Sequence, residues 1–478
     1  MKYLIDGVNK SVLSLANQYK HLKQDDEFKV FDDCFSNIEG LDLVQINNFY
    51  VDEDGSKVKV ERSDNDSRRM KITTDFDSAL EWCDCYVTFR SVPYEITIQS
   101  DLENAEKQVN ALLSRIEQAR SAGKKIYLGN RFSEEFSEIA GTYENCINPH
   151  ITKENLEEIK DYSFFFKGTY PYFGFNTTMI VGTNSVSGKF SCALKAKKHY
   201  EDLGEKVILI HTEETYPFLD DQNGTVYGFC RNFSDLTTDE DFTYLQSLVA
   251  KIYNEQRPDR IIFVTQSGFG IDGVISSYQD SDNGYKMKGL WDVFITRSFG
   301  LDEVIVSANC NRLDLARRLV EYYNIKNSKV NASMVYVNPC IYDAGETIEY
   351  VTDDKTKFYK AQQKCRAKEL ELQLKGFALE HPEIDIQCDY CGITDKVMEF
   401  KTREDFKYLC ASSYAAKILS GIKTILSSDI AELVVEEIKT QAEELHSEYG
   451  ISDEDFNKIK EEGFSFSVSD KPQEESES

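Results

Sequence analysis

The sequence predicts an α/β protein built around a parallel β-sheet that carries a phosphate-binding loop. Short, continuous apolar runs such as 179–181 and 206–210 are typical of strands that helices cover on both faces of a parallel sheet. A glycine-containing turn at 182–188 joins one of these runs to a helical pattern. The predicted domains are a Rossmann-like α/β domain over 1–150, a phosphate-loop domain over 151–350, a helical C-terminal region over 351–465 and a disordered acidic tail over 466–478.

The first 150 residues alternate short apolar runs with helical patterns, which predicts a separate α/β unit. Apolar residues recur at helical spacing between Val12 and Tyr19, and a longer amphipathic pattern covers 102–122. The polar stretch 52–66 predicts a hairpin or a loop. No Gly-x-Gly-x-x-Gly follows the first strand, so the residues do not support dinucleotide binding. The predicted strands are 2–6, 29–31, 43–46, 84–89 and 125–129.

The phosphate-binding loop is predicted from two glycines and a lysine at the start of a helical pattern. Gly182 and Gly188 allow tight turns, so that several backbone N–H groups converge on one phosphate beside the positive end of the helix dipole. Lys189 adds a full positive charge. Five residues separate the glycines where a standard Walker loop has four, and Phe190 replaces the usual hydroxyl, which comes next at Ser191. An ordinary strand-to-helix turn with a solvated lysine is the alternative.

The neighbouring strands predict where this loop lies in the sheet. The helical pattern after the loop ends near Gly204, which suits a C-cap, and the strand that follows completes a βαβ unit. Further strands are predicted over 260–265, 303–308 and 334–338. Ligands in such sheets bind beyond the carboxyl ends of the strands, so the polar residues at those ends should gather around the loop. These residues are Glu213, Glu214, Gln266, Ser267, Asn309 and Asn311.

The loop from Gly182 to Lys189, Gly-Thr-Asn-x-x-x-Gly-Lys, resembles that of dethiobiotin-synthetase-like P-loop proteins. A closer resemblance is to a poorly characterised bacterial P-loop family with an N-terminal Rossmann-like domain and a bulky residue between the lysine and the hydroxyl. Thr212-Glu213 and Gln266-Ser267-Gly268 extend the match, which covers about residues 175–345. Some members of that family are described as enzymes acting on N-acetyl-glutamate. The resemblance implies a P-loop NTPase-like fold and a nucleotide or phosphate site.

The resemblance and the chemistry of the residues together assign roles. The loop backbone would hold the β-phosphate of ATP or GTP, Lys189 would reach the terminal phosphate, and Ser191 would approach Mg²⁺. A shift of one residue turns a helical side chain by about 100°, so Ser191 serves only if the helix starts differently. Glu213 is the candidate second metal ligand or base, with a solvated acid as the alternative, and it forms the candidate catalytic pair with Lys189. The predicted nucleotide-binding residues are Gly182, Thr183, Asn184, Ser187, Gly188, Lys189, Phe190, Ser191, Gln266 and Asn309.

The composition narrows the classes of partner. The 478 residues carry a formal net charge of −28, which disfavours a general nucleic-acid surface and binding to anionic membranes but not a local nucleotide site. No apolar run approaches the roughly 18 residues that span a bilayer, and the chain enters a strand directly, so we expect a cytoplasmic protein. The 12 cysteines lack the dense spacing of a small secreted scaffold, which predicts reduced thiols.

Two features beyond the loop are worth testing. Cys388-Asp-Tyr-Cys391 favours a structural role, because no second Cys-x-x-Cys exists, with zinc binding and a redox pair as alternatives. Further zinc ligands would come from Cys365, His381 or Cys410. His211, at a strand end, is the histidine to test, although a hydrogen-bonded structural histidine is favoured.

Amphipathic helical patterns dominate the C-terminal region. They predict either a surface for homo-oligomers or other partners, or a cap over the nucleotide site. The predicted helices are 355–379, 406–426, 430–445 and 452–462.

The leading functional hypothesis is an ATP- or GTP-dependent enzyme of the ligase or kinase kind, acting on a small carboxylate, amine or peptide. Glu213 and Glu214 favour it. The second hypothesis is a non-catalytic accessory protein that binds nucleotide or phosphate without turnover, which Phe190 and the scarcity of acid–base residues favour. The third is a racemase- or hydrolase-type activity on an acylated amino acid, with the loop retained for structure or regulation.

Overall fold

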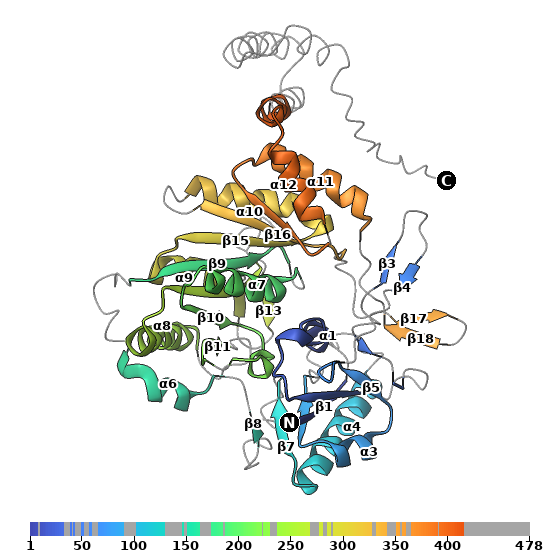
Figure 1. The fold of residues 1–478 in the computed structure, drawn as a ribbon. Helices are drawn as coiled ribbons and strands as arrows, with labels where there is room; N and C mark the ends of the chain where they lie inside the picture. Colours follow the sequence, from blue (N-terminus) through green and yellow to red (C-terminus); the bar gives the residue numbers. More distant parts are fainter. Residues whose placement is uncertain are drawn as a thin grey trace, which may run out of the picture. The chain divides into compact units, whose positions relative to one another are not determined.

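The computed structural model contains two parallel β-sheets with their helices (Figure 1). One compact unit, Met1–Leu370 with Ile384–Thr394, holds both sheets, and a second comprises Glu371–Glu383 with Asp395–Ser478. The structure describes residues 1–7, 10–32, 39–40, 42–43, 49–51, 57–59, 66–89, 102–129, 146–147, 151–162, 174–184, 187–221, 223–229, 237–267, 277–280, 284–287, 290–326, 331–341, 350–353, 356–359, 365–390 and 392–414.

The N-terminal sheet has six parallel strands in the order β5-β2-β1-β6-β7-β8. Numbered along the chain, this is the Rossmann order 3-2-1-4-5-6, so the predicted Rossmann-like fold is confirmed. β5 and β8 are too short to show a hydrophobic period, which explains why the sequence did not reveal them. The strands are β1 (Lys2–Asp6), β2 (Glu27–Phe31), β5 (Lys71–Thr73), β6 (Cys85–Thr88), β7 (Lys125–Leu128) and β8 (Cys146–Ile147).

In the described part of the chain, this sheet is accompanied by α1 (Lys10–Asn17), α3 (Phe76–Trp82) and α4 (Leu102–Ser121), with a 3₁₀ turn, η1 (Tyr19–His21), after α1. The polar stretch predicted as a hairpin or loop lies at β3 (Phe49–Val51) and β4 (Lys57–Lys59), which pair antiparallel. The strand predicted at 43–46 falls largely outside the described residues, since 44–46 are not described, and Asp42 just before it makes an isolated antiparallel bridge to Lys71.

The second sheet has seven strands, all parallel, in the order β11-β10-β12-β9-β15-β16-β19. The strand that leads into the predicted phosphate loop, β9, is at the centre. The strands are β9 (Asn176–Gly182), β10 (Val207–His211), β11 (Val226–Gly228), β12 (Arg260–Ser267), β15 (Glu303–Asn309), β16 (Asn331–Asn338) and β19 (Asp385–Cys388).

Helices cover both faces of this sheet. The connection from β9 to β10 moves towards one edge and that from β15 to β16 towards the other. Right-handed crossovers therefore place α7 (Lys189–Asp202) and α10 (Leu313–Lys326) on opposite faces. Buried side chains of α7 and α1 belong to one continuous apolar cluster, so the two sheets share a core. The remaining helices are α6 (Lys153–Ile159), α8 (Thr238–Gln256) and α9 (Leu290–Phe299), with 3₁₀ turns η4 (Tyr216–Phe218) and η6 (Cys310–Arg312).

Among the described residues after 350, strands occupy part of the chain where the sequence predicted a helix. The helix expected from Lys355 begins at Ala367 instead, as α11 (Ala367–Glu380), because a hairpin precedes it. A further strand, β19, then joins the edge of the second sheet before α12 (Ile393–Lys401). A helix covers 406–414, whereas the helices predicted at 430–445 and 452–462 and the tail fall outside the described residues. The two hairpins in the later part of the chain are β13 (Ser277–Asp280) with β14 (Gly284–Met287), and β17 (Tyr350–Asp353) with β18 (Thr356–Tyr359).

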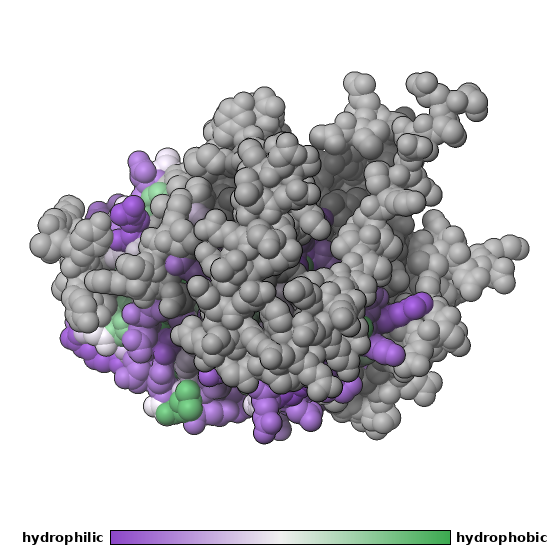
Figure 2. All heavy atoms as spheres, turned by 90° about the horizontal axis from the view of Figure 1, so that it is seen from above, coloured by the Kyte–Doolittle hydropathy of each residue, from purple (hydrophilic) through white to green (hydrophobic). Residues whose placement is uncertain are grey.

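The described surface is largely hydrophilic in the view of Figure 2, where apolar residues appear as isolated green patches. No helix within the described residues is long and apolar enough to cross a membrane.

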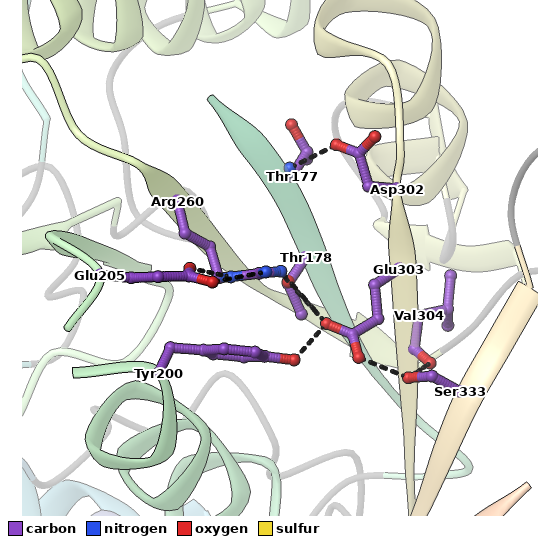
Figure 3. A network of polar contacts seen from close by, with 9 residues as sticks. All are labelled: Thr177, Thr178, Tyr200, Glu205, Arg260, Asp302, Glu303, Val304 and Ser333. Atoms are coloured by element: carbon purple, nitrogen blue, oxygen red, sulfur yellow. Dashed lines mark hydrogen bonds and ion pairs between the residues drawn. The ribbon is translucent and has the colours of Figure 1, made fainter. Parts of the chain in front are cut away.

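The amino ends of the second sheet are joined by a charged network (Figure 3). Arg260, at the start of β12, donates to Glu205 at 2.6 Å and to Glu303, at the start of β15, at 3.3 Å. Glu303 also accepts bonds from Ser333 at 2.6 Å and from Thr178 at 2.9 Å. Because each charge has several partners, this network holds four neighbouring strands and the chain before β10 in register.

A second set of donors completes the network. The hydroxyl of Tyr200 on α7 donates to Glu303, and its ring lies 3.8 Å beneath the guanidinium of Arg260. The guanidinium also donates to the Thr178 hydroxyl at 2.7 Å. The backbone N–H of Thr177 donates to Asp302 at 2.7 Å. The helix after the phosphate loop is therefore anchored to the sheet at the end opposite the loop.

Candidate functional site

The loop between β9 and α7 needs glycine at both ends. A Cβ atom on Gly182 would lie 2.6 Å from the hydroxyl of Ser187 and 2.9 Å from the ammonium nitrogen of Lys189. Gly188 has a φ of +93°, in the left-handed region, and caps α7, which starts at Lys189. The glycines thus leave the space that the hydroxyl and the ammonium group approach.

Hydrogen bonds fix the loop to the neighbouring strand β15. The N–H of Thr183 donates to the carbonyl oxygen of Ser307 at 2.9 Å. The hydroxyl of Ser307 donates to the backbone carbonyl oxygen of Ser187, also at 2.9 Å. The Asn184 amide donates to Asn309 at 2.8 Å, and the Asn309 amide donates to the Cys340 carbonyl at 3.0 Å. Asn309, predicted to bind nucleotide, therefore holds the loop in this structure.

Two side chains of the loop present donors to its interior. Lys189 is only 8% exposed, and its ammonium group donates to the carbonyl oxygen of Asn184 at 3.2 Å. Ser187 is fully buried, and its hydroxyl has no hydrogen-bond partner within the described part of the chain. An unpaired buried donor next to a buried cation is costly in an isolated protein and fits a phosphate oxygen.

The first turn of α7 explains the departure from a standard loop. Phe190 is buried and its ring packs edge-to-face against His211 with the centroids 4.6 Å apart. The next residue, Ser191, accepts a hydrogen bond from the side chain of Gln18, at the end of α1. The position of the usual metal-binding hydroxyl is therefore filled by an apolar ring, and the hydroxyl that follows contacts the N-terminal domain.

Two acids after β10 lie in a low-dielectric environment near Lys189. Burial raises the pKa of Glu213, and the positive charge of Lys189 opposes this rise. Burial and the charge of Glu213 raise the pKa of Glu214 to about 7, while a 2.6 Å hydrogen bond from Ser11 opposes the rise. Tyr127 on β7 donates to the backbone carbonyl of Glu214. A carboxyl group that titrates near neutral pH is suited to general acid–base chemistry.

His211 supports these acids without carrying a charge. Its Nδ1 atom accepts the N–H of Glu213 at 2.9 Å, and complete burial lowers its pKa to about 3. A neutral imidazole that accepts at Nδ1 carries its hydrogen on Nε2, and this atom is buried without a partner among the residues described. The histidine thus fixes the backbone at Glu213.

Several residues that the sequence assigned to one site lie together in the structure, and further residues contact them. The loop residues, Glu213 and Asn309 lie at the carboxyl edge of one sheet. The side chain of Gln266 and the whole of Gly268 lie outside the described residues. Ser11, Gln18 and Tyr127 were not anticipated, because they are far from the loop in sequence and no local pattern marks them.

A metal role for Ser191 and Glu213 remains a prediction. No group of three or more His, Cys, Asp or Glu among the described residues is arranged to hold a metal ion. Mg²⁺ at a nucleotide takes one or two carboxylates and fills its shell with water and phosphate oxygen, so a single acid such as Glu213 is compatible with it. The zinc alternative for Cys388 and Cys391 stays a prediction, and Cys391 lies outside the described residues.

No protein-family model matches the sequence, and no curated protein matches it either. Among solved structures, a DUF1611 family protein from Anabaena variabilis is similar, with 13% identity and a TM-score of 0.48 over 83% of this chain and 99% of that one. A nucleotide-binding protein in complex with ADP from Archaeoglobus fulgidus is 12% identical, with a TM-score of 0.23 over 53% of this chain and 94% of that one.

A signal recognition particle protein from Aeropyrum pernix, in complex with GDP, is also similar. It is 14% identical, with a TM-score of 0.27 over 66% of this chain and 68% of that one. The three likenesses are distant, and the α/β fold class rests on the two parallel sheets and their strand orders.

Proposed function

We propose that the protein binds ATP or GTP at the loop from Gly182 to Gly188. The observation that carries this proposal is the buried pair of donors, the unpartnered Ser187 hydroxyl and the Lys189 ammonium group, beside the space that Gly182 leaves open. The loop N–H groups and the amino end of α7 would bind the β-phosphate, and Lys189 would reach the terminal phosphate.

We further propose an enzyme of the ligase or kinase class, because two buried acids, Glu213 and Glu214, follow the strand next to the loop in the chain. The nucleotide would supply an activated phosphoryl group, with Mg²⁺ held through Glu213 and, once its hydroxyl leaves the side chain of Gln18, through Ser191. Glu214 would accept a proton from a small carboxylic acid, amine or peptide substrate, because its pKa of about 7 suits proton exchange at neutral pH. Lys189 would orient the phosphate and Glu213 would balance the charge of Lys189.

A second candidate is a non-catalytic protein that binds nucleotide without turnover. Phe190 fills the position of the usual metal-binding hydroxyl, and Ser191 is hydrogen-bonded to Gln18. Weak metal binding would slow phosphoryl transfer while leaving phosphate binding intact.

Calorimetric titration of ATP and GTP, with and without Mg²⁺, tests the nucleotide proposal. We expect wild type to bind, and Lys189→Ala to lose about 10- to 100-fold in affinity, since a hydrogen bond to a charged group is worth about 1.5–3 kcal/mol. Lys198→Ala is the matched control, because Lys198 is exposed on the same helix and pairs with Asp202 on the surface. No binding at millimolar nucleotide would refute the proposal, and binding that Lys189→Ala leaves intact would move the site elsewhere.

Phosphate release in the presence of small carboxylates, amines and peptides separates the two candidates. An enzyme should turn over with one substrate class, and Glu214→Gln should lower its turnover while nucleotide affinity stays within about twofold. Nucleotide binding with no release across the three classes would favour the accessory protein.

A further inference from the structure

Two cysteines meet at the carboxyl edge of the second sheet, close to the loop but outside the proposed nucleotide site. Cys310 directly follows β15, and Cys365 lies two residues before α11. The thiols of Cys310 and Cys365 both donate to the carbonyl oxygen of Pro339, at 3.2 Å and 3.3 Å. Residues 55 positions apart in sequence are thus brought to one atom by the fold.

The Pro339 carbonyl oxygen has more donors than lone pairs. Besides the two thiols, it accepts the backbone N–H of Cys365 at 3.0 Å. A carbonyl oxygen has two lone pairs, and a thiol is the weaker kind of donor. Converting both thiols to a disulfide would remove the two weak donors and leave the backbone hydrogen bond in place.

The two thiols lie against the same carbonyl oxygen, and their interaction shifts their pKa values in opposite directions. A hydrogen bond with Cys365 lowers the pKa of Cys310, and the same hydrogen bond raises the pKa of Cys365. Cys310 therefore loses its proton more readily and supplies the nucleophilic thiolate, whereas Cys365 keeps its proton. Cys310 is buried, whereas Cys365 is partly exposed and gives a small oxidant access to the pair. Cys192, by contrast, is buried in the apolar core with a raised pKa, which makes it a poor nucleophile.

We propose that Cys310 and Cys365 form a reversible disulfide when the protein meets a two-electron oxidant of the peroxide class. The Cys310 thiolate attacks one oxygen of hydrogen peroxide, the O–O bond breaks, and a sulfenic acid and hydroxide form. The hydroxide takes up the proton that Cys310 released and becomes water. The Cys365 sulfur then attacks the Cys310 sulfur, an S–S bond forms, and the sulfenic hydroxyl leaves with the Cys365 proton as a second water. Two thiols are oxidised and one peroxide is reduced.

The bridge would act on the strand end that supports the loop. Cys310 follows Asn309, whose amide links Asn184 of the loop to the Cys340 carbonyl. A covalent link from Cys310 to Cys365 would tie the chain before α11 to this point. The proposal does not depend on which ligand the loop binds.

Peptide mapping of the folded full-length protein tests the pair. Trypsin releases Cys310 in peptide 298–312 and Cys365 in peptide 365–366. After equimolar peroxide we expect the two peptides to be joined, with the loss of two hydrogens, and dithiothreitol to separate them. Cys310→Ser and Cys365→Ser should each abolish the joined species. Cys388→Ser, which removes a partly exposed thiol at the end of the neighbouring strand β19, should leave its yield within about twofold.

Circular dichroism must show that the variants are folded. The proposal is overturned if folded wild type yields no joined peptide, or if Cys310 or Cys365 pairs as often with Cys340 or Cys388. A joined peptide whose yield is equal in urea would also overturn it, because the unfolded chain has no reason to prefer this pair.

Discussion

The charged residues at the two ends of the second sheet differ in how they are paired. At the amino ends, Arg260 and Glu303 lie among several hydrogen-bond partners from neighbouring strands and from α7. At the carboxyl ends, Ser187 and His211 each bury a polar atom without a partner among the described residues, and Glu214 has a pKa raised to about 7. The same parallel strands run from one end to the other, so the difference lies in the side chains and not in the backbone.

This difference suggests that the residues at the amino ends stabilise the fold, whereas those at the carboxyl ends serve ligand binding. A satisfied buried ion network stabilises a particular strand register, whereas removal of one member leaves an unpaired charge. An unsatisfied buried donor or a destabilised carboxylate lowers stability and makes binding of a ligand more favourable. We expect mutations at the amino end to change stability with little effect on ligand binding, and mutations at the carboxyl end to change binding more.

Glu303→Ala should have the largest effect on stability. It removes the acceptor of Arg260, Tyr200, Thr178 and Ser333 together, so the free energy of unfolding should fall by about 3 kcal/mol. Urea unfolding measures this loss. Nucleotide affinity of the folded fraction should be unchanged, and a tenfold loss would show that the two ends are coupled. Glu201→Ala, which breaks only a surface pair with Lys197, is the control and should cost at most about 0.5 kcal/mol.

Gly182→Ala should damage both properties at the carboxyl end. The new methyl group would lie 2.6 Å from the Ser187 hydroxyl, so overpacking should cost about 1–3 kcal/mol and displace both loop donors. Calorimetry should show weakened nucleotide binding in protein that circular dichroism reports as folded. Gly376→Ala has open space around its Cβ position within a helix, and it should leave binding unchanged and raise stability slightly. Wild-type affinity in Gly182→Ala would contradict the loop assignment.

The buried Glu214 at the carboxyl end should make the stability of the protein depend on pH. The pKa of Glu214 is raised in the folded state, so its contribution is present in full below its unfolded pKa, near 4.5, and is lost as the pH rises to about 7. The free energy of unfolding should therefore fall by up to about 1.4 kcal/mol per pH unit in this window from this group. Urea unfolding between pH 4.5 and 8 should show a shallower fall for Glu214→Gln. Identical slopes in the two proteins would contradict the raised pKa.

Removal of single hydroxyl groups should give the smallest effects, with opposite signs at the two ends. Ser187→Ala removes an unpartnered buried hydroxyl, so stability should stay equal or rise while nucleotide affinity falls by about fivefold, near 1 kcal/mol. Ser333→Ala removes a donor to Glu303 at 2.6 Å and should lower stability by about 1 kcal/mol with no change in affinity. Equal loss of stability in the two variants would mean that Ser187 has a structural partner.

Local features of the fold were readable from the sequence. The apolar runs predicted β9, β10, β12 and β15 because strands covered on both faces are apolar throughout. The helix after residue 355 was predicted too early, since its charged residues fit a helical face while residues 356–359 pair with 350–353 in a hairpin. A hairpin of this kind depends on pairing between segments, which a helical pattern does not exclude.

The sequence by itself determined the chemistry of the loop: two glycines, a lysine, and a phenylalanine where a hydroxyl is usual. Tertiary structure decided which groups surround it. It directs Ser191 towards Gln18, places Ser11 against Glu214, and brings the thiols of Cys310 and Cys365 to one carbonyl oxygen. The physical reason is that loop and strand propensities act over a few residues, whereas these contacts join segments up to 203 positions apart through the packing of a shared core.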